Sequence, residues 1–278
     1  MTQLIAVLML LGLAGCQEKE IKVREGFTSA RISHDEKIGL FVFKREHYYP
    51  GTMGLLGPGT PDKYVVNVTM IGAYDMATGA VRVLYRRDNG NRWVDETNDI
   101  HIVDSFGSRG LISADGDYHW LDLNSGELTK IPLIEELTSR GRGQGQVILV
   151  DELGSLILIN KAFGQAMNYS APYEVWLRRP NGEYERMVQG SANAGDFYNV
   201  KNNEVYFYSS PDRSYVAYNL QTRVRRKCAE KEVPRRWAES LTADFLTGDH
   251  GSPQPTIGKR VDGKWDRHPA QIDTSKLR

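Results

Sequence analysis

Cysteine is scarce in this chain of 278 residues, and an excess of either charge is missing altogether. The sequence has two cysteines and 35 Lys and Arg against 35 Asp and Glu, so its formal net charge is zero. Nucleic-acid-binding proteins draw much of their affinity from excess Lys and Arg, so we expect no nucleic-acid partner. Only 11 Pro occur beside 27 Gly and 14 Tyr, a balance that favours tight turns and strands over disorder.

Long hydrophobic runs are also missing, except for one at the N-terminus. It extends from Leu4 to Ala14, eleven residues without a charge. A helix rises 1.5 Å per residue, so this run is far too short for a bilayer core of about 30 Å. It is typical of the apolar segment of a secretory signal peptide.

The run ends in the motif Leu13-Ala14-Gly15-Cys16. This motif resembles the lipobox of bacterial lipoproteins, in which a branched apolar residue and two small residues precede a cysteine. The resemblance implies that residues 1–15 are a signal peptide. It also implies that Cys16 carries a diacylglyceryl group and an N-acyl chain such as palmitate, which would anchor the protein to a membrane. The alternative is an ordinary signal peptide followed by a chance cysteine.

The residue after Cys16 bears on the membrane involved. In proteobacterial lipoproteins an Asp at this position retains the protein at the inner membrane, and this chain has Gln17. The resemblance therefore implies the outer membrane of a bacterial cell envelope, with the body facing the periplasm or, alternatively, the cell surface. An acylated Cys16 leaves Cys228 without a disulfide partner, so we expect a free and buried thiol.

The body reads as an antiparallel all-β chain. Runs of β-branched and aromatic residues recur between Gly, Asn and Asp turns. We expect a tether over residues 16–30, a β domain over 31–232 and a partly irregular extension over 233–278. In the extension we expect a short helix or turn near Trp237–Phe245, then an extended tail in which Val261–Lys264 could form a last hairpin. The expected strands are Ile38–Phe43, Tyr64–Ile71, Val147–Val150, Leu156–Ile159, Tyr173–Leu177 and Val205–Tyr208.

One unit of the body repeats. Residues Ser113–Ser125 align without gaps on Ser210–Thr222, and related turns begin at positions 75, 122, 178 and 219, which are 47, 56 and 41 residues apart. Such periods are typical of propeller blades. The short S-x-D and D-x-x-T-G turns resemble those of TolB-like and WD40-like β-propellers, which implies a ring of about four to six blades. Four units are visible, so a fifth must come from the termini or the ring is open; an irregular β-sandwich is the alternative fold.

Motifs for catalysis and metal binding are not found. The six histidines include no H-E-x-x-H pair, and the chain has no C-x-x-C. We interpret Asp115-Gly116 as a turn whose Asp side chain binds nearby backbone N–H groups, and Arg140–Gly145 as a connecting loop. We therefore expect no metal, no cofactor and no catalytic residue.

The best candidate for partner binding is the apolar, glycine-rich segment Tyr48–Pro61. Its side chains Tyr48, Tyr49, Met53 and Leu56 could bury enough apolar area to anchor a partner. A segment folded over one end of the core is the alternative. Long loops in compact domains often carry function.

Two classes of function stay open. The first is a non-catalytic binding or scaffold module for a protein or glycan partner in the envelope. The second is a propeller-type enzyme acting on polysaccharide, for which Asp95, Asp99, Asp104 and His101 would have to meet acids from another blade. Charge is uneven, with net −6 over residues 88–122 and net +5 over residues 222–236, and this asymmetry could steer a charged partner.

Overall fold

The computed structural model describes most of the chain between residues 20 and 277. The described residues are 20–51, 63–89, 100–133, 135–136, 145–150, 155–161, 173–188, 197–201, 204–209, 212–219, 221–233, 242–247 and 253–277. Among them, no helix has the length and apolar character needed to cross a membrane.

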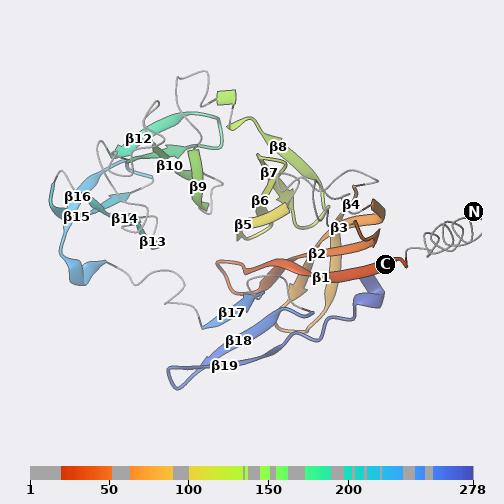
Figure 1. Cartoon of the computed structure of the whole chain (residues 1–278). Coiled ribbons are helices and arrows are strands. Elements are labelled where there is room, and N and C mark those ends of the chain that lie inside the picture. The colour runs from red at the N-terminus through yellow and green to blue at the C-terminus, as the bar shows by residue number, and fades with distance from the viewer. Residues whose placement is uncertain are drawn as a thin grey trace, which may run out of the picture.

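Five antiparallel sheets form a ring, the arrangement of a five-bladed β-propeller (Figure 1). The first sheet comprises β1 (Lys22–Ile32), β2 (Ile38–Tyr49), β3 (Lys63–Asp75) and β4 (Val81–Asp88). The second comprises β5 (Ile100–Phe106), β6 (Arg109–Ala114), β7 (Asp117–Asp122) and β8 (Leu128–Ile131). The third comprises β9 (Gly145–Val150), β10 (Leu156–Lys161), β11 (Tyr173–Arg178) and β12 (Tyr184–Val188).

The fourth and fifth sheets complete the ring. The fourth comprises β13 (Phe197–Lys201), β14 (Glu204–Ser209), β15 (Ser214–Asn219) and β16 (Arg225–Cys228), followed by a short 3₁₀ turn at Glu230–Glu232. The fifth has three strands, β17 (Ala243–Leu246), β18 (Thr256–Val261) and β19 (Lys264–Pro269), and a 3₁₀ turn at Thr274–Leu277 ends the described chain. The propeller expectation is confirmed, and the fifth sheet does come from a terminus.

The repeated turn has the same structural role in three of its four copies. Asp75, Asp122 and Asn219 each end the third strand of their sheet, and the side-chain oxygen of each accepts hydrogen bonds from two backbone N–H groups of the following turn at 2.7–3.0 Å. Arg178 ends the third strand of the third sheet but cannot accept such bonds. There Asn181 binds the N–H of Glu183 instead, at 3.1 Å.

The aligned tyrosines confirm the repeat. Tyr118 is the second residue of β7 and Tyr215 is the second residue of β15, each the third strand of its sheet. The turns before them differ, because β6 and β7 are joined by the two residues Asp115-Gly116, both with positive φ. The expected turn at Asp115-Gly116 is confirmed, and the Asp115 carboxylate also lies 2.6 Å from Arg87 on β4 and joins two strands of different sheets.

Neighbouring sheets pack through their innermost strands. β1 contacts β5, and β5 contacts β9. β5 runs in the same direction as β1, since the hydroxyl of Ser29 accepts from the N–H of Ile102 at 3.2 Å and the N–H of His34 donates to the carbonyl of Ser105 at 3.1 Å. Apolar residues of the first two sheets fill the space between them. They are Leu40, Val42, Ile71, Ala73, Ile100, Ile102, Ile112, Ala114, Leu121 and Leu123.

The fifth sheet also packs on the first, but its first strand runs in the opposite direction to β1. Thr242 lies at the β1–β2 turn beside Glu36, and Phe245 lies against Gly39, so β17 runs antiparallel to β1. Phe245 is fully buried and stacks on Tyr74 at a ring-centroid distance of 5.4 Å. The core between these sheets comprises Phe27, Ile32, Phe41, Phe43, Val68, Met70, Tyr74, Phe245, Ile257, Ala270, Ile272 and Leu277.

Three expectations about the termini need correction. The tether expected to residue 30 differs from the structure, because β1 already pairs with β2 from Lys22 onward. The extension over 233–278 contributes the three strands of the fifth sheet to the ring, and its expected hairpin is confirmed, because Val261 pairs with Lys264. The helix or turn expected to reach Phe245 is wrong for its described end, because Ala243–Leu246 is a strand that buries Phe245 between the first and fifth sheets.

Candidate functional site

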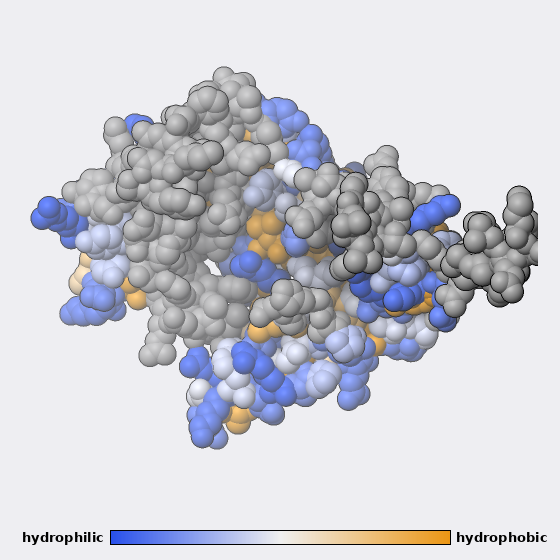
Figure 2. Space-filling view, viewed as in Figure 1, coloured by the Kyte–Doolittle hydropathy of each residue, from blue (hydrophilic) through white to orange (hydrophobic). Residues whose placement is uncertain are grey.

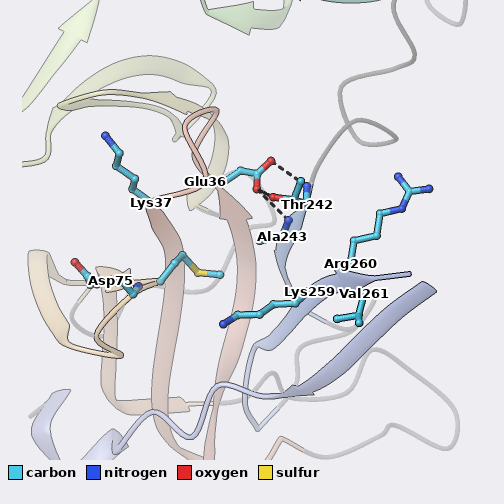
Figure 3. A pocket seen from close by; sticks show the side chains of 10 residues that line it. Glu36, Lys37, Asp75, Thr242, Ala243, Lys259, Arg260 and Val261 are labelled. Atoms are coloured by element: carbon cyan, nitrogen blue, oxygen red, sulfur yellow. Dashed lines mark hydrogen bonds between the residues drawn. The ribbon is translucent and has the colours of Figure 1, made fainter. Parts of the chain in front are cut away.

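A pocket of about 550 Å³ lies between the first and fifth sheets. The β1–β2 turn, the β3–β4 turn, the start of β17 and the end of β18 form its walls (Figure 3). Its lining residues are Glu36, Lys37, Asp75, Met76, Ala77, Thr242, Ala243, Lys259, Arg260 and Val261. The sequence separations are large, so only closure of the ring creates this site.

Glu36 connects the two sheets at the pocket wall. It lies in the β1–β2 turn with a positive φ of 56°. Its carboxylate accepts hydrogen bonds from the N–H groups of Thr242 at 3.0 Å and Ala243 at 3.1 Å, and from the hydroxyl of Thr242 (Figure 3). These three donors occupy both oxygens, so Glu36 serves to hold the sheets together rather than to transfer protons.

Asp75 is engaged in the same way by its own turn. Its Oδ1 accepts from the N–H of Thr78 at 2.7 Å, from the hydroxyl of Thr78 at 2.9 Å and from the N–H of Ala77 at 3.0 Å. The hydrogen bonds from Thr78 hold the pKa of the Asp75 carboxyl below its usual value. Both pocket carboxylates are therefore structural acceptors.

Three cationic side chains complete the rim. Lys37 is mostly exposed and lies 3.7 Å from Asp35. Lys259 and Arg260 are exposed on β18. In Figure 3 Lys259 extends across the pocket, whereas Lys37 and Arg260 extend away from it. Lys37 is paired with Asp35, so Lys259 is the cation that extends across the pocket and can meet an anionic group.

A buried ion pair lies between the first and second sheets. Asp104 on β5 is fully buried, and its carboxylate contacts His34 at 2.9 Å, the N–H of Ser105 at 3.0 Å and Arg31 at 3.5 Å. Asp104 belongs to the acidic set of the enzyme hypothesis, but these contacts commit it to the sheet interface. His101 is exposed on β5. Asp95 and Asp99 lie outside the described residues.

Carboxylates around the third sheet are also bound by arginine. A second pocket of about 400 Å³ includes Glu185, which lies 2.9 Å from Arg179 and accepts from the hydroxyl of Tyr218. Burial opposes ionisation of Glu185, but these contacts outweigh it and lower its pKa. Glu136 binds Arg178 through two hydrogen bonds of 2.7 and 2.9 Å. Such bidentate pairs position sheets and leave little room for a free catalytic acid.

The expected partner-binding residues are only partly described. Tyr48 and Tyr49 are half-buried and form the end of β2, so the expected loop does not begin with them. Lys22 and Tyr64 flank Tyr48 in the sheet, and the guanidinium of Arg24 lies over the Tyr48 ring at 5.4 Å. Met53, Leu56 and the lipobox cysteine Cys16 lie outside the described residues.

The remaining expectations concern cysteine, metals and charge. Cys228 is a free, half-buried thiol on β16, and burial raises its pKa. Within the described ranges, no group of three His, Cys, Asp or Glu residues could hold a metal ion. The basic segment around β16 is partly paired, because Arg223, Arg225 and Arg226 contact acidic side chains. Its capacity to steer a partner is smaller than the sequence suggests.

Sequence reasoning missed the pocket between the first and fifth sheets. In the sequence, the segment with Glu36 and Lys37 has the pattern of an ordinary charged hairpin, and Lys259 has the pattern of a solvent-exposed strand residue. Glu36 and Thr242 are 206 residues apart in the chain. No local signal could have placed them together.

No family model matches this sequence, and no curated protein matches it significantly. A solved structure of Kluyveromyces lactis Hsv2 with a complete loop 6CD is similar to 92% of this chain and 76% of its own, with 12% sequence identity and a TM-score of 0.32. A TM-score this low supports no conclusion about function. The fold assignment rests on the five sheets.

Proposed function

We propose that this protein is a non-catalytic binding module of the bacterial cell envelope, anchored by lipid on Cys16 to the outer membrane and facing the periplasm. A propeller arrangement is consistent with a binding or scaffold role, since it presents turns and loops on a rigid ring. The lipobox resemblance at Leu13–Cys16 supports the anchor. The partner is a protein or glycan that presents a negatively charged group.

The observation that carries the binding role is the chemistry of the pocket between the first and fifth sheets. Its two carboxylates, Glu36 and Asp75, accept hydrogen bonds from N–H and hydroxyl donors of neighbouring turns, while Lys259 extends its ammonium group across the pocket. Hydrolysis of a polysaccharide needs two carboxyl groups that can exchange protons across the scissile bond. A cationic rim without such a pair suits recognition better than hydrolysis.

The segment Tyr48–Pro61 remains a second docking candidate. Replacement of Tyr49, Met53 and Leu56 by Ser tests it, because each well-buried apolar anchor contributes roughly 1.5–3 kcal/mol to binding. Weaker partner capture by a folded triple variant would support this contact. Unchanged capture would remove the segment from the site.

Site-specific photo-crosslinking in intact cells tests the proposed function. A photoreactive residue at Lys259 should give one reproducible adduct, whereas the same residue at Lys264, also exposed in the fifth sheet, should not. Charge reversal at Lys37 and Arg260 should abolish the adduct without unfolding the chain. A glycan partner would instead be retained by the purified wild-type chain and lost from the reversed variant.

Two results would contradict the proposal. One is turnover of envelope polysaccharide by the purified chain, abolished by Glu36→Gln or Asp75→Asn. The other is a Cys16→Ser variant that still fractionates with membranes and still incorporates labelled lipid. The first would establish an enzyme, and the second would remove the anchor.

A further inference from the structure

The first sheet projects beyond the ring at the end where β1 begins. Strands β1, β2 and β3 have 11, 12 and 13 residues, whereas the strands of the other sheets have four to seven. The buried part of β1 starts at Phe27, so residues 22–26 extend past it by about 16 Å at 3.3 Å per residue. Residues 44–49 of β2 and 63–67 of β3 extend beside them in register. We call residues 21–26, 44–49 and 63–67 the projecting end.

The tip of the projecting end combines aliphatic and cationic side chains. Ile21, Val23 and Val65 are 42%, 59% and 48% exposed. Lys22 and Lys63 are exposed beside them, and in the described part of the chain neither forms an ion pair. Figure 2 shows hydrophobic and hydrophilic residues side by side at this end of the molecule. Such a surface matches a lipid headgroup layer, where ammonium groups meet phosphates and short aliphatic side chains meet the acyl boundary.

Charges nearer the ring are paired within the projecting end. Arg24 lies 2.5 Å from Glu46, and Arg45 bonds to Glu25. These cross-strand pairs stiffen the strands and leave the two lysines at the tip as the cations open to an outside partner. The projecting end is therefore a preformed ribbon with an amphipathic tip.

The chain length before β1 places this tip close to the anchor. Six Cα–Cα steps separate Cys16 from Lys22, and an extended chain covers at most about 21 Å in six steps. We propose that the projecting end of the first sheet lies against the phospholipid surface and sets the orientation of the ring. This inference rests on the proposed lipid anchor. The anchor raises the local concentration of the bilayer, so a contact of modest area is enough.

The orientation has a consequence for the pocket between the first and fifth sheets. Ten residue steps of β1 separate Lys22 from Ile32, about 33 Å along the strand. The β1–β2 turn with Glu36 and Lys37 follows Ile32. A ring that stands on its projecting end thus holds the cationic rim away from the membrane, open to a partner.

Depth-dependent quenching tests the orientation on the full lipidated chain. In a Cys228→Ser background, a fluorescent thiol label is placed at Val65→Cys or, as the distal control, at Lys259→Cys. The protein is reconstituted in vesicles of phosphatidylethanolamine and phosphatidylglycerol that contain a headgroup spin-labelled lipid. The label at position 65 should be quenched and the label at position 259 should not. Equal quenching at both positions, or no quenching at 65 in protein that floats with the vesicles, would overturn the orientation.

A matched pair of variants links the result to the projecting end. Val23→Asp should abolish quenching at position 65 while the protein still floats, because a carboxylate would meet lipid phosphates. Val83→Asp on β4, where the residue is 37% exposed, should leave quenching unchanged. Equal effects of the two variants would overturn the proposed surface. Failure of the wild-type chain to float would instead refute the anchor, and the surface with it.

Discussion

Gly39 on β2 is the residue whose replacement should most directly weaken the junction between the first and fifth sheets. A Cβ atom at this position would lie 2.5 Å from Cγ of Phe245 and within 2.8 Å of both Cδ atoms. Phe245 cannot move aside easily, because it is fully buried and stacks on Tyr74. Overpacking of this kind costs about 1–3 kcal/mol. At about 2 kcal/mol, the melting temperature of a chain this size should fall by roughly 4–8 °C.

A double-mutant cycle distinguishes this clash from a general loss of stability. Phe245→Leu alone should destabilise the protein, since it removes ring contacts, but it also makes room for a methyl group at position 39. The free energies of unfolding, measured in urea, should therefore be non-additive, with Gly39→Ala costing at least about 1 kcal/mol less in the Phe245→Leu background. Strict additivity, or a Gly39→Ala variant as stable as wild type, would refute the packing of β17 on β2.

Three further changes follow from the same structure. Glu36→Ala should raise hydrogen exchange at the Thr242 and Ala243 amides about tenfold, or about 1.4 kcal/mol, while amides of the second sheet stay protected. Asp104→Ala should lower the free energy of unfolding by about 3 kcal/mol, since it leaves His34 and Arg31 without their buried partner. Hydrogen bonds lower the pKa of Asp75 and Asp122, so their stabilisation is present above about pH 4 and lost as the pH falls through the folded values. Asp75→Ala with Asp122→Ala should flatten the acid limb of a pH–stability profile.

Local sequence patterns predict much of this fold because the hydrogen bonds that stabilise the repeated turn lie within the turn itself. Asp75, Asp122 and Asn219 bind backbone groups two and three residues ahead, so their turns are visible in the sequence. The fifth sheet carries a local turn signal only at its last hairpin, Val261–Lys264. Its strands are defined by packing on the first sheet, where Phe245 meets Gly39, and no periodicity marks that contact.

The candidate site was less predictable than the fold. The pocket between the first and fifth sheets depends on Glu36 and Thr242, which ring closure brings together from opposite ends of the chain. Tyr48 and Tyr49 were expected to begin an apolar, glycine-rich loop. Their assignment to a loop failed because β2 continues to Tyr49, paired with β3 as far as Lys63.

The proposal of a lipid-anchored binding module depends above all on the covalent state of Cys16. Mass spectrometry of the intact protein extracted from membranes measures that state. The proposal predicts a chain that begins at Cys16 and carries a diacylglyceryl group together with an N-acyl chain. A chain that begins at another residue, or one in which Cys16 is unmodified, would contradict it.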